Sequence, residues 1–141
     1  MSKINVVLYE PQIPQNNSNI ARIYLVGKLD FYLSIKYAKR PGLDYWECID
    51  IHKFDNMEDL YSAFPNSNFY YLSTKSKKVY TGIKFNDGDF LVFGPETRGL
   101  PEQYVKDKNA IRLPMKEGQR SFNLSFSVAI TVYEIIRQNR I

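Results

Sequence analysis

Three short segments of this 141-residue chain combine amide, hydroxyl and charged side chains with glycine or proline, as ligand-binding loops do. Each follows, directly or within a few residues, a run of apolar residues expected to form a strand. In a sheet of parallel strands, ligands bind outside the carboxyl ends of the strands. We therefore expect the segments to meet at one edge of a sheet. They are PQNNSNIAR at 14–22, GPETRGLP at 94–101 and RSFNLS at 120–125.

None of these segments matches a nucleotide-binding signature. The chain lacks G-x-x-x-x-G-K-[ST], and Gly94 and Gly99 are too far apart for G-x-G-x-x-G, which excludes the common kinase and dehydrogenase sites. The two glycines bracket a tight loop across which Glu96 and Arg98 are placed to pair, or they simply permit a turn. Ser121 is either a ligand contact or a helix cap, and both hypotheses stay open.

Cysteine and histidine usage excludes several further classes of site. Cys48 and His52 are each the only residue of their type, so an internal disulfide, a cysteine zinc cluster and a two-histidine metal site all lack ligands. We expect no metal, and we expect His52 to be an ordinary surface or core residue. No run approaches the ~20 apolar residues of a membrane span, and the first ten residues do not resemble a secretory signal. These features predict a cytoplasmic protein with one domain over 1–141 and no membrane partner.

The charge distribution is compatible with a polyanionic partner. Nineteen Lys and Arg against fifteen Asp and Glu give a net charge of +4. One basic group comprises Lys36, Lys39 and Arg40, and a second comprises Lys75, Lys77 and Lys78, with tyrosines among them. Cations beside aromatic rings suit a nucleic-acid surface. Solvated loops next to ordinary strand tyrosines explain the same pattern.

Strands and helices alternate in the predicted order of elements, which indicates an α/β fold with a mostly parallel sheet flanked by helices. Polar capping residues and the spacing of Ile20, Ile23 and Tyr24 predict a helix from Ile20 to Val26 that ends at Gly27. The other predicted helices are Asp55–Phe64 and Asn123–Asn139. The predicted strands are Ile4–Tyr9, Tyr45–Ile51, Phe69–Ser73, Phe90–Phe93 and Ile111–Met115.

In sequence order, the three segments resemble the signature motifs of the SPOUT superfamily of RNA methyltransferases, in its 2′-O-ribose branch. The motifs are N-x-x-N-I-x-R, F-G-x-E-x-x-G-L-P, and P-M followed by S-x-N-L-S. Within that branch the chain is most similar to the TrmL group, the tRNA (cytidine/uridine-34)-2′-O-methyltransferases. The resemblance runs nearly end to end, through VVLYEPQIP, PGLDYWE, DGDFLVFGPETRGLP, IRLPM and VYEIIRQ.

This resemblance implies a C-terminal trefoil knot over about 90–134 and S-adenosylmethionine as cofactor, with S-adenosylhomocysteine as product. It implies a tRNA substrate and a homodimer that pairs through the C-terminal helix near Tyr133. The family pattern assigns five positions to the cofactor: Leu72, Gly94, Leu113, Ser121 and Leu124.

Arg22 matches the arginine that the family places at the reacting hydroxyl. An arginine has a pKa above ~12 and is a poor base, so the resemblance implies that Arg22 orients the ribose and stabilises the developing alkoxide. Phosphate or water would then take the proton.

The chain departs from the family pattern in several places. Ser18 stands where the family has glycine, and Phe126 where it has a small or polar residue. In addition, an overlay on the family leaves out about two helical turns between Ile23 and Tyr24. On that overlay Tyr24 to Val26 is a strand, which conflicts with the helix predicted from spacing. Two alternative functions remain: methylation at another tRNA or rRNA position, and a noncatalytic RNA-binding module.

Overall fold

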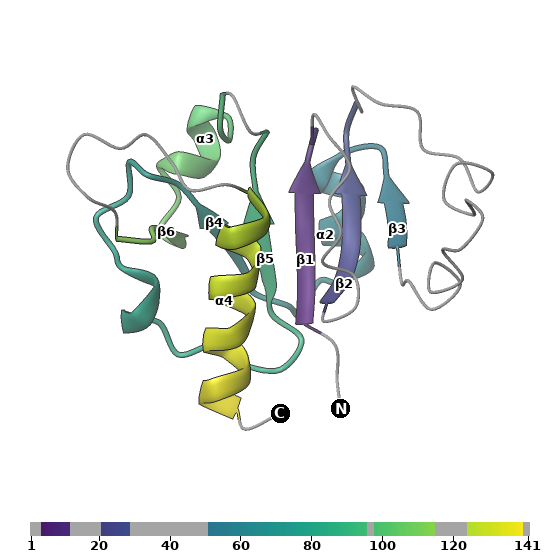
Figure 1. Cartoon of the computed structure of the whole chain (residues 1–141). Coiled ribbons are helices and arrows are strands. Elements are labelled where there is room, and N and C mark those ends of the chain that lie inside the picture. The colour runs from purple at the N-terminus through teal and green to yellow at the C-terminus, as the bar shows by residue number, and fades with distance from the viewer. Residues whose placement is uncertain (1–3, 12–20, 29–50, 96–97, 115–123, 140–141) are drawn as a thin grey trace, which may run out of the picture.

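The described residues form one sheet of six strands that is covered by helices on both faces (Figure 1). The computed structural model describes residues 4–11, 21–28, 51–95, 98–114 and 124–139. The strands lie in the order β3-β2-β1-β5-β4-β6, and each neighbouring pair is parallel. The predicted α/β fold with a mostly parallel sheet is confirmed. The elements are β1 (Ile4–Tyr9), β2 (Ala21–Val26), β3 (Ile51–Phe54), α2 (Met57–Ala63), β4 (Phe69–Leu72), the 3₁₀ helix η2 (Tyr80–Gly82), β5 (Phe90–Phe93), α3 (Glu102–Val105), β6 (Ala110–Ile111) and α4 (Leu124–Asn139).

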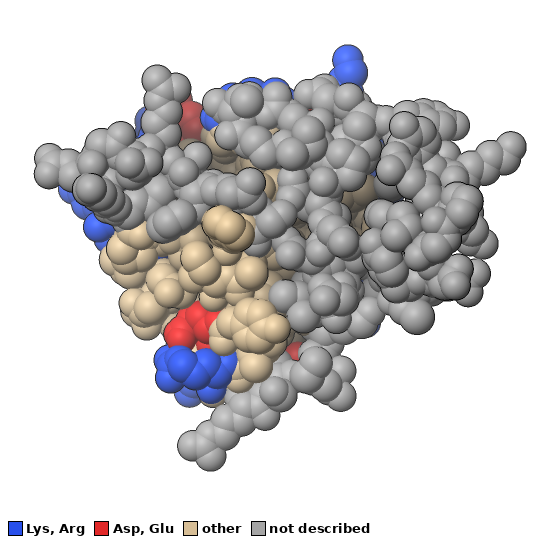
Figure 2. Space-filling model, viewed as in Figure 1, with Lys and Arg blue, Asp and Glu red and all other residues tan. Residues whose placement is uncertain are grey.

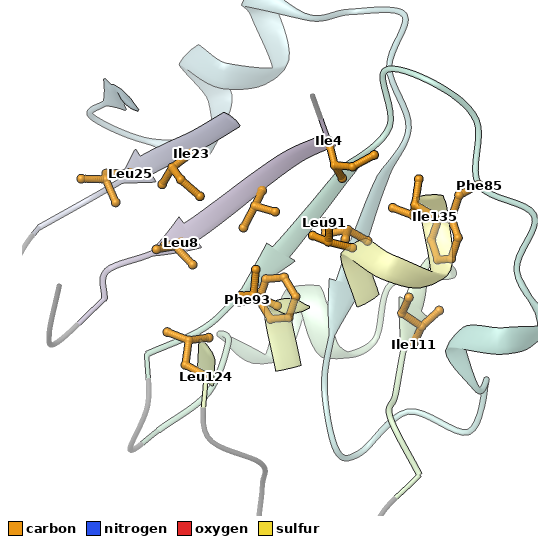
Figure 3. Close-up of a cluster of buried hydrophobic side chains, with 13 residues drawn as sticks. Ile4, Leu8, Ile23, Leu25, Phe85, Leu91, Phe93, Ile111, Leu124 and Ile135 are labelled. Carbon is orange, nitrogen blue, oxygen red and sulfur yellow. The ribbon is translucent and has the colours of Figure 1, made fainter. Parts of the chain in front are cut away.

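The two central strands, β1 and β5, are apolar almost throughout because both faces of the sheet are covered. Alternate residues of each strand enter separate cores. Leu8 and Phe93 pack in the core that includes α4 residues, which Figure 3 shows in close-up. Val7 and Val92 enter the other core, which includes residues of α2 and α3.

The helix predicted from Ile20 to Val26 is wrong, because residues Ala21–Val26 form strand β2. Its six residues pair in parallel with β1, and its last four pair with β3 on the other side. Ile23 and Leu25 enter one core, and Tyr24 and Val26 the other, which is the two-residue period of a strand. The alternative from the family overlay, with Tyr24 to Val26 as strand, is confirmed within β2.

The remaining predictions are largely confirmed. The helix predicted at Asp55–Phe64 is α2, and the oxygen of the Asn56 side chain caps it by accepting a hydrogen bond from Asp59 N at 2.8 Å. The strand predicted at Ile111–Met115 is shorter in the structure, where β6 ends at Ile111. Beyond it, Arg112 forms only an isolated bridge with Val79. The predicted strand at 45–51 lies outside the described residues except for Ile51, which begins β3. The knot expected over about 90–134 includes 115–123, which also lie outside them. Within the described parts of the chain, no helix is both long and apolar enough to cross a membrane.

Candidate functional site

Four of the five residues expected at the cofactor lie along the carboxyl edge of the sheet. Leu72 is the last residue of β4, Gly94 follows β5, and Leu113 lies two residues after β6. These three strands are neighbours in the sheet. Leu124 begins α4 and belongs to the same buried cluster as Phe93, near the end of β5 (Figure 3). Ser121 lies outside the described residues. The described parts of the second and third motifs therefore lie at one edge together with Leu72. Of the first motif only Ala21 and Arg22 are described, and they begin β2 at the opposite end of the strands.

The loop after β5 depends on a close approach between two backbone segments. A Cβ on Gly94 would lie 2.4 Å from Gly99 C and from Leu100 N, so a side chain has no room there. Gly99 has a φ of +69° and donates its N–H to Pro95 O at 3.0 Å, which closes the loop. Both glycines are thus required by the path of the chain beside the candidate site.

The turn after β4 places cations beside this edge. Ser73 N donates to Ile111 O at 2.8 Å, and Ser76 Oγ donates to Ala110 O at 2.6 Å, so the turn is fixed against β6. Lys75, Lys77 and Lys78 are exposed on this turn. Lys78 Nζ donates to Lys108 O at 2.7 Å. Of the two basic groups expected from sequence, this one lies next to Leu72; Lys36, Lys39 and Arg40 lie outside the described residues.

An ion pair joins the loops after the two central strands, and sequence reasoning missed its acidic partner. Arg98 Nη2 lies 2.9 Å from Glu10 Oε1. Glu10 follows β1 directly and has a φ of +45°, a backbone conformation that costs a non-glycine residue on the order of 1–3 kcal/mol. The expected partner of Arg98, Glu96, lies outside the described residues. In the sequence, the feature that could have identified Glu10 as a site residue is its position directly after a buried strand.

Arg22 lies away from this edge. Its Cα pairs with that of Asn5 near the start of β1, and Val26 at the carboxyl end of β2 lies four residues further along the strand. At a rise of ~3.3 Å per residue, this places the Cα of Arg22 about 13 Å below the level of Val26. The structure therefore does not bring Arg22 together with Leu72, Gly94 and Leu113. Its role at the reacting hydroxyl stays a prediction.

The two residues considered for metal or redox chemistry do not add to the site. His52 is exposed on β3 and stacks on Tyr24, with ring centroids 5.1 Å apart. Cys48 lies outside the described residues. Among the residues that the structure does describe, no group of three or more His, Cys, Asp or Glu side chains is placed to hold a metal ion.

A tyrosine cluster lies on the face of the sheet that α2 and α3 cover. The hydroxyl oxygens of Tyr61 and Tyr71 are 2.5 Å apart, and the Tyr71 ring stacks on Tyr104 with centroids 5.1 Å apart. Burial raises the pKa of Tyr61, and the hydrogen bond to Tyr71 raises it further. Burial also raises the pKa of Tyr71 and of Tyr104. These hydroxyls stay neutral at physiological pH, so their role is packing rather than proton abstraction.

Helix α4 leaves an apolar stripe exposed. Phe126, Ile130 and Tyr133 are 66%, 38% and 56% exposed, and their spacing of four and three residues puts them on one face. Figure 2 shows uncharged atoms over this part of the molecule, with a red and blue group near the C-terminal end of α4. Glu134 and Arg137 pair there, with Arg137 Nε 2.7 Å from Glu134 Oε1.

Comparison with known proteins identifies the family of this chain. The profile of the SpoU rRNA methylase family matches residues 3–133, which include the four expected cofactor residues that the structure describes. The chain belongs to the SpoU rRNA methylase family. A relative from Methylovorus glucosotrophus, named tRNA (cytidine(34)-2′-O)-methyltransferase, is 41% identical over 147 positions, covering 96% of this chain and 95% of the relative. A relative of the same name from Saccharophagus degradans is 39% identical and covers 95% and 94%.

Solved structures of this family share the fold along nearly the whole chain. One, from a study of 2′-OH methylation of C/U34 on tRNA, has a TM-score of 0.86 at 34% identity and covers 99% of this chain and 97% of the other. The SpoU methyltransferase AviRb from Streptomyces viridochromogenes, solved with AdoMet, has a TM-score of 0.77 at 14% identity. This chain spans 58% of AviRb, so that likeness shows the fold alone.

Proposed function

We propose that the chain transfers the methyl group of S-adenosylmethionine to the ribose 2′-OH of nucleotide 34 in tRNA, acting on cytidine or uridine. The observation that carries this proposal is the convergence of Leu72, Gly94 and Leu113 at the carboxyl ends of three neighbouring strands. Similarity over nearly the full length to tRNA (cytidine(34)-2′-O)-methyltransferases supports the same substrate. The enzyme would act in the cytoplasm, where tRNA is found.

The residues at this edge fit the proposed cofactor. Leu72 and Leu113 are only partly buried, so their apolar side chains leave surface for an adenine ring or a methionine chain. Leu124 extends the apolar wall, Gly94 keeps the adjoining loop tight, and Ser121 completes the set that the resemblance implies. When bound, S-adenosylmethionine supplies an electrophilic methyl group on a sulfonium, and S-adenosylhomocysteine is released. The protein's contribution is then to hold the two reactants in line, which lowers barriers by up to ~7–11 kcal/mol in well-aligned systems.

Arg22 is proposed for the reacting hydroxyl on the resemblance alone. Because its Cα lies near the amino-terminal end of β2, this part of the proposal is separate from the cofactor site. The position of Arg22 also favours one alternative, a noncatalytic RNA-binding module that keeps the fold.

A homodimer is proposed through α4. The exposed residues Phe126, Ile130 and Tyr133 form a continuous apolar face, and burying one such side chain contributes about 1.5–3 kcal/mol. Pairing two copies of this face would remove it from water. The dimer that the resemblance implies near Tyr133 uses the same helix.

The decisive experiment maps methyl groups on RNA. Purified protein is incubated with labelled S-adenosylmethionine and total tRNA, and then with transcripts in which nucleotide 34 is replaced by its 2′-deoxy form. We expect label at position 34 and its loss from the deoxy transcript. Label at another position would move the target to another nucleotide. An absence of label together with no heat of S-adenosylmethionine binding in calorimetry would support the noncatalytic module instead.

A further inference from the structure

The Glu10–Arg98 ion pair spans the point where the connections of the sheet diverge. Strands β1 and β5 are neighbours, but β1 leads to β2 on one side, whereas β5 leads past β4 to β6 on the other. In open parallel sheets this is where a crevice forms at the carboxyl edge. Glu10 follows β1 and Arg98 lies in the loop after β5, so the pair crosses this point.

The backbone around Glu10 is shaped to hold its carboxylate. Glu10 N donates to Val26 O at 2.8 Å, and Glu10 Oε2 accepts from Lys28 N at 3.4 Å. A Cβ on Gly27 would lie 2.7 Å from Glu10 Cγ, so only glycine leaves room for the side chain. A strained non-glycine residue persists where its surroundings over-determine it, and such residues cluster at functional sites. The end of β2 therefore fixes the direction in which Glu10 points.

Arg98 connects this fixed carboxylate to the loop of the candidate cofactor site. Within the described part of that loop, Pro95 and Leu100 are buried, whereas Arg98 and Gly99 between them are exposed. The base of the loop is thus anchored by packing, and the Arg98 side chain connects the described tip, Arg98 and Gly99, to Glu10. The pair joins residues 88 positions apart.

We propose that Glu10 and Arg98 form a positioning pair that holds the tip of loop 94–101 in the geometry needed at the cofactor edge. The inference rests on the proposed function for its purpose, since it assigns these residues to the same site. Neither is a catalytic residue: the pair acts through Gly94 and the loop backbone. A different role for Arg98, direct contact with an RNA phosphate, is an outcome that the test distinguishes.

The test uses Glu10→Gln, Arg98→Gln, the double variant and Arg98→Lys. The matched control is Glu102→Gln, which breaks the exposed Glu102–Lys106 pair (3.0 Å) that stays within α3. Hydrogen exchange of a peptide covering 94–101 reports on the loop without any ligand, through the Gly99 amide that donates to Pro95. Calorimetry with S-adenosylmethionine and steady-state kinetics on tRNA report on the site.

We expect exchange in 94–101 to rise about threefold or more in Glu10→Gln and in Arg98→Gln, and no further in the double variant, because both changes break one interaction. The dissociation constant for S-adenosylmethionine should rise in the same variants, and Arg98→Lys should recover part of the lost affinity. The Tm of each variant should stay near that of wild type, since exposed ion pairs add little stability. The control leaves exchange and affinity unchanged.

Unchanged exchange in Glu10→Gln would overturn the proposal, as would an Arg98→Gln variant that weakens tRNA binding alone. If the proposed function itself were wrong, the result would differ, because wild-type protein would then neither bind S-adenosylmethionine nor methylate RNA. Loop exchange still decides on the positioning pair in that case.

Discussion

The Cα of Arg22 lies directly opposite that of Asn5, where β1 and β2 begin their parallel pairing. This is about 13 Å along the strand from the edge that holds Gly94, which is more than an arginine side chain spans. The role proposed for Arg22 at the reacting hydroxyl nevertheless predicts that Arg22→Lys lowers kcat for tRNA methylation about tenfold or more. A kcat within about threefold of wild type, a barrier change under about 1 kcal/mol, would contradict that role and agree with the distance. The measurement is single-turnover transfer of labelled methyl groups at saturating tRNA.

The physical reason for the predicted loss lies in the shape of the guanidinium group. Lysine keeps the charge of Arg22 but loses the planar fork that binds in a bidentate way. A loss of kcat of about tenfold or more, with S-adenosylmethionine affinity and Tm unchanged, would support the role at the hydroxyl that the family resemblance implies.

Gly94→Ala tests the loop after β5. The new Cβ would meet the backbone of Gly99 and Leu100 at 2.4 Å, and backbone atoms cannot move aside as a flexible side chain does. We expect a loss of about 1–3 kcal/mol in the free energy of unfolding and weaker S-adenosylmethionine binding. Gly82→Ala is the control, because nothing lies within 4 Å of its added Cβ. Thermal melts and calorimetry that rank the two variants alike would contradict this view of the loop.

Lysines on the turn after β4 are predicted to contribute to the salt dependence of tRNA binding. Each phosphate contact contributes about 0.7–0.9 to the slope of log affinity against log salt concentration. Replacing Lys75 and Lys77 with Gln should reduce that slope by about 1–2 and weaken binding at low salt. Lys53→Gln is the control, since Lys53 lies on β3 at the opposite end of the sheet order. An unchanged slope in filter-binding titrations would remove this turn from the RNA surface.

The exposed stripe of α4 predicts an oligomeric state. We expect wild-type protein in light-scattering measurements to have twice the 16.5 kDa mass of one chain. Ile130→Glu combined with Tyr133→Glu should give a monomer, because a dimer would have to bury both new charges without partners. Thr81→Glu, at an exposed position on η2, should leave the dimer intact. A monomeric wild type at micromolar concentration would argue against pairing through α4.

The Tyr61–Tyr71 pair predicts how stability changes at high pH. The pKa values of both hydroxyls are raised in the folded state, so the folded protein favours their protonated forms. Their contribution to stability is complete below the unfolded-state pKa of about 10 and is lost as pH rises toward the folded-state values. In Tyr61→Phe, the free energy of unfolding measured in urea should therefore fall less steeply as pH rises above about 10. At pH 7 the same variant should be less stable than wild type by about 1 kcal/mol. Equal slopes in the variant and in wild type would contradict the assignment.

The sequence predicted those elements whose signals are local. The apolar run Ile4–Tyr9 predicted β1, and the segment Asp55–Phe64 predicted α2, because the signals for both depend on residues close together in the sequence. The convergence of Leu72, Gly94 and Leu113 was predictable once parallel strands were expected, since parallel strands end at the same edge.

Two features depended on distant pairing and were missed or mispredicted. The spacing of Ile20, Ile23 and Tyr24 suits a helix, but hydrogen bonding to β1 and β3 makes 21–26 a strand. The Glu10–Arg98 pair was missed for a similar reason, because the residue type of Glu10 does not reveal its positive φ or a partner 88 residues away.

The position of β5 between β1 and β4 has a consequence for synthesis of the protein. Asn5 pairs with Phe90, so one side of β1 stays without its neighbour until some 85 further residues have left the ribosome. At roughly 5–20 residues per second, that interval is about 4–17 s. During it, an apolar strand edge is open to other nascent chains, which makes this the stage at which a chaperone would most improve the yield of folded protein.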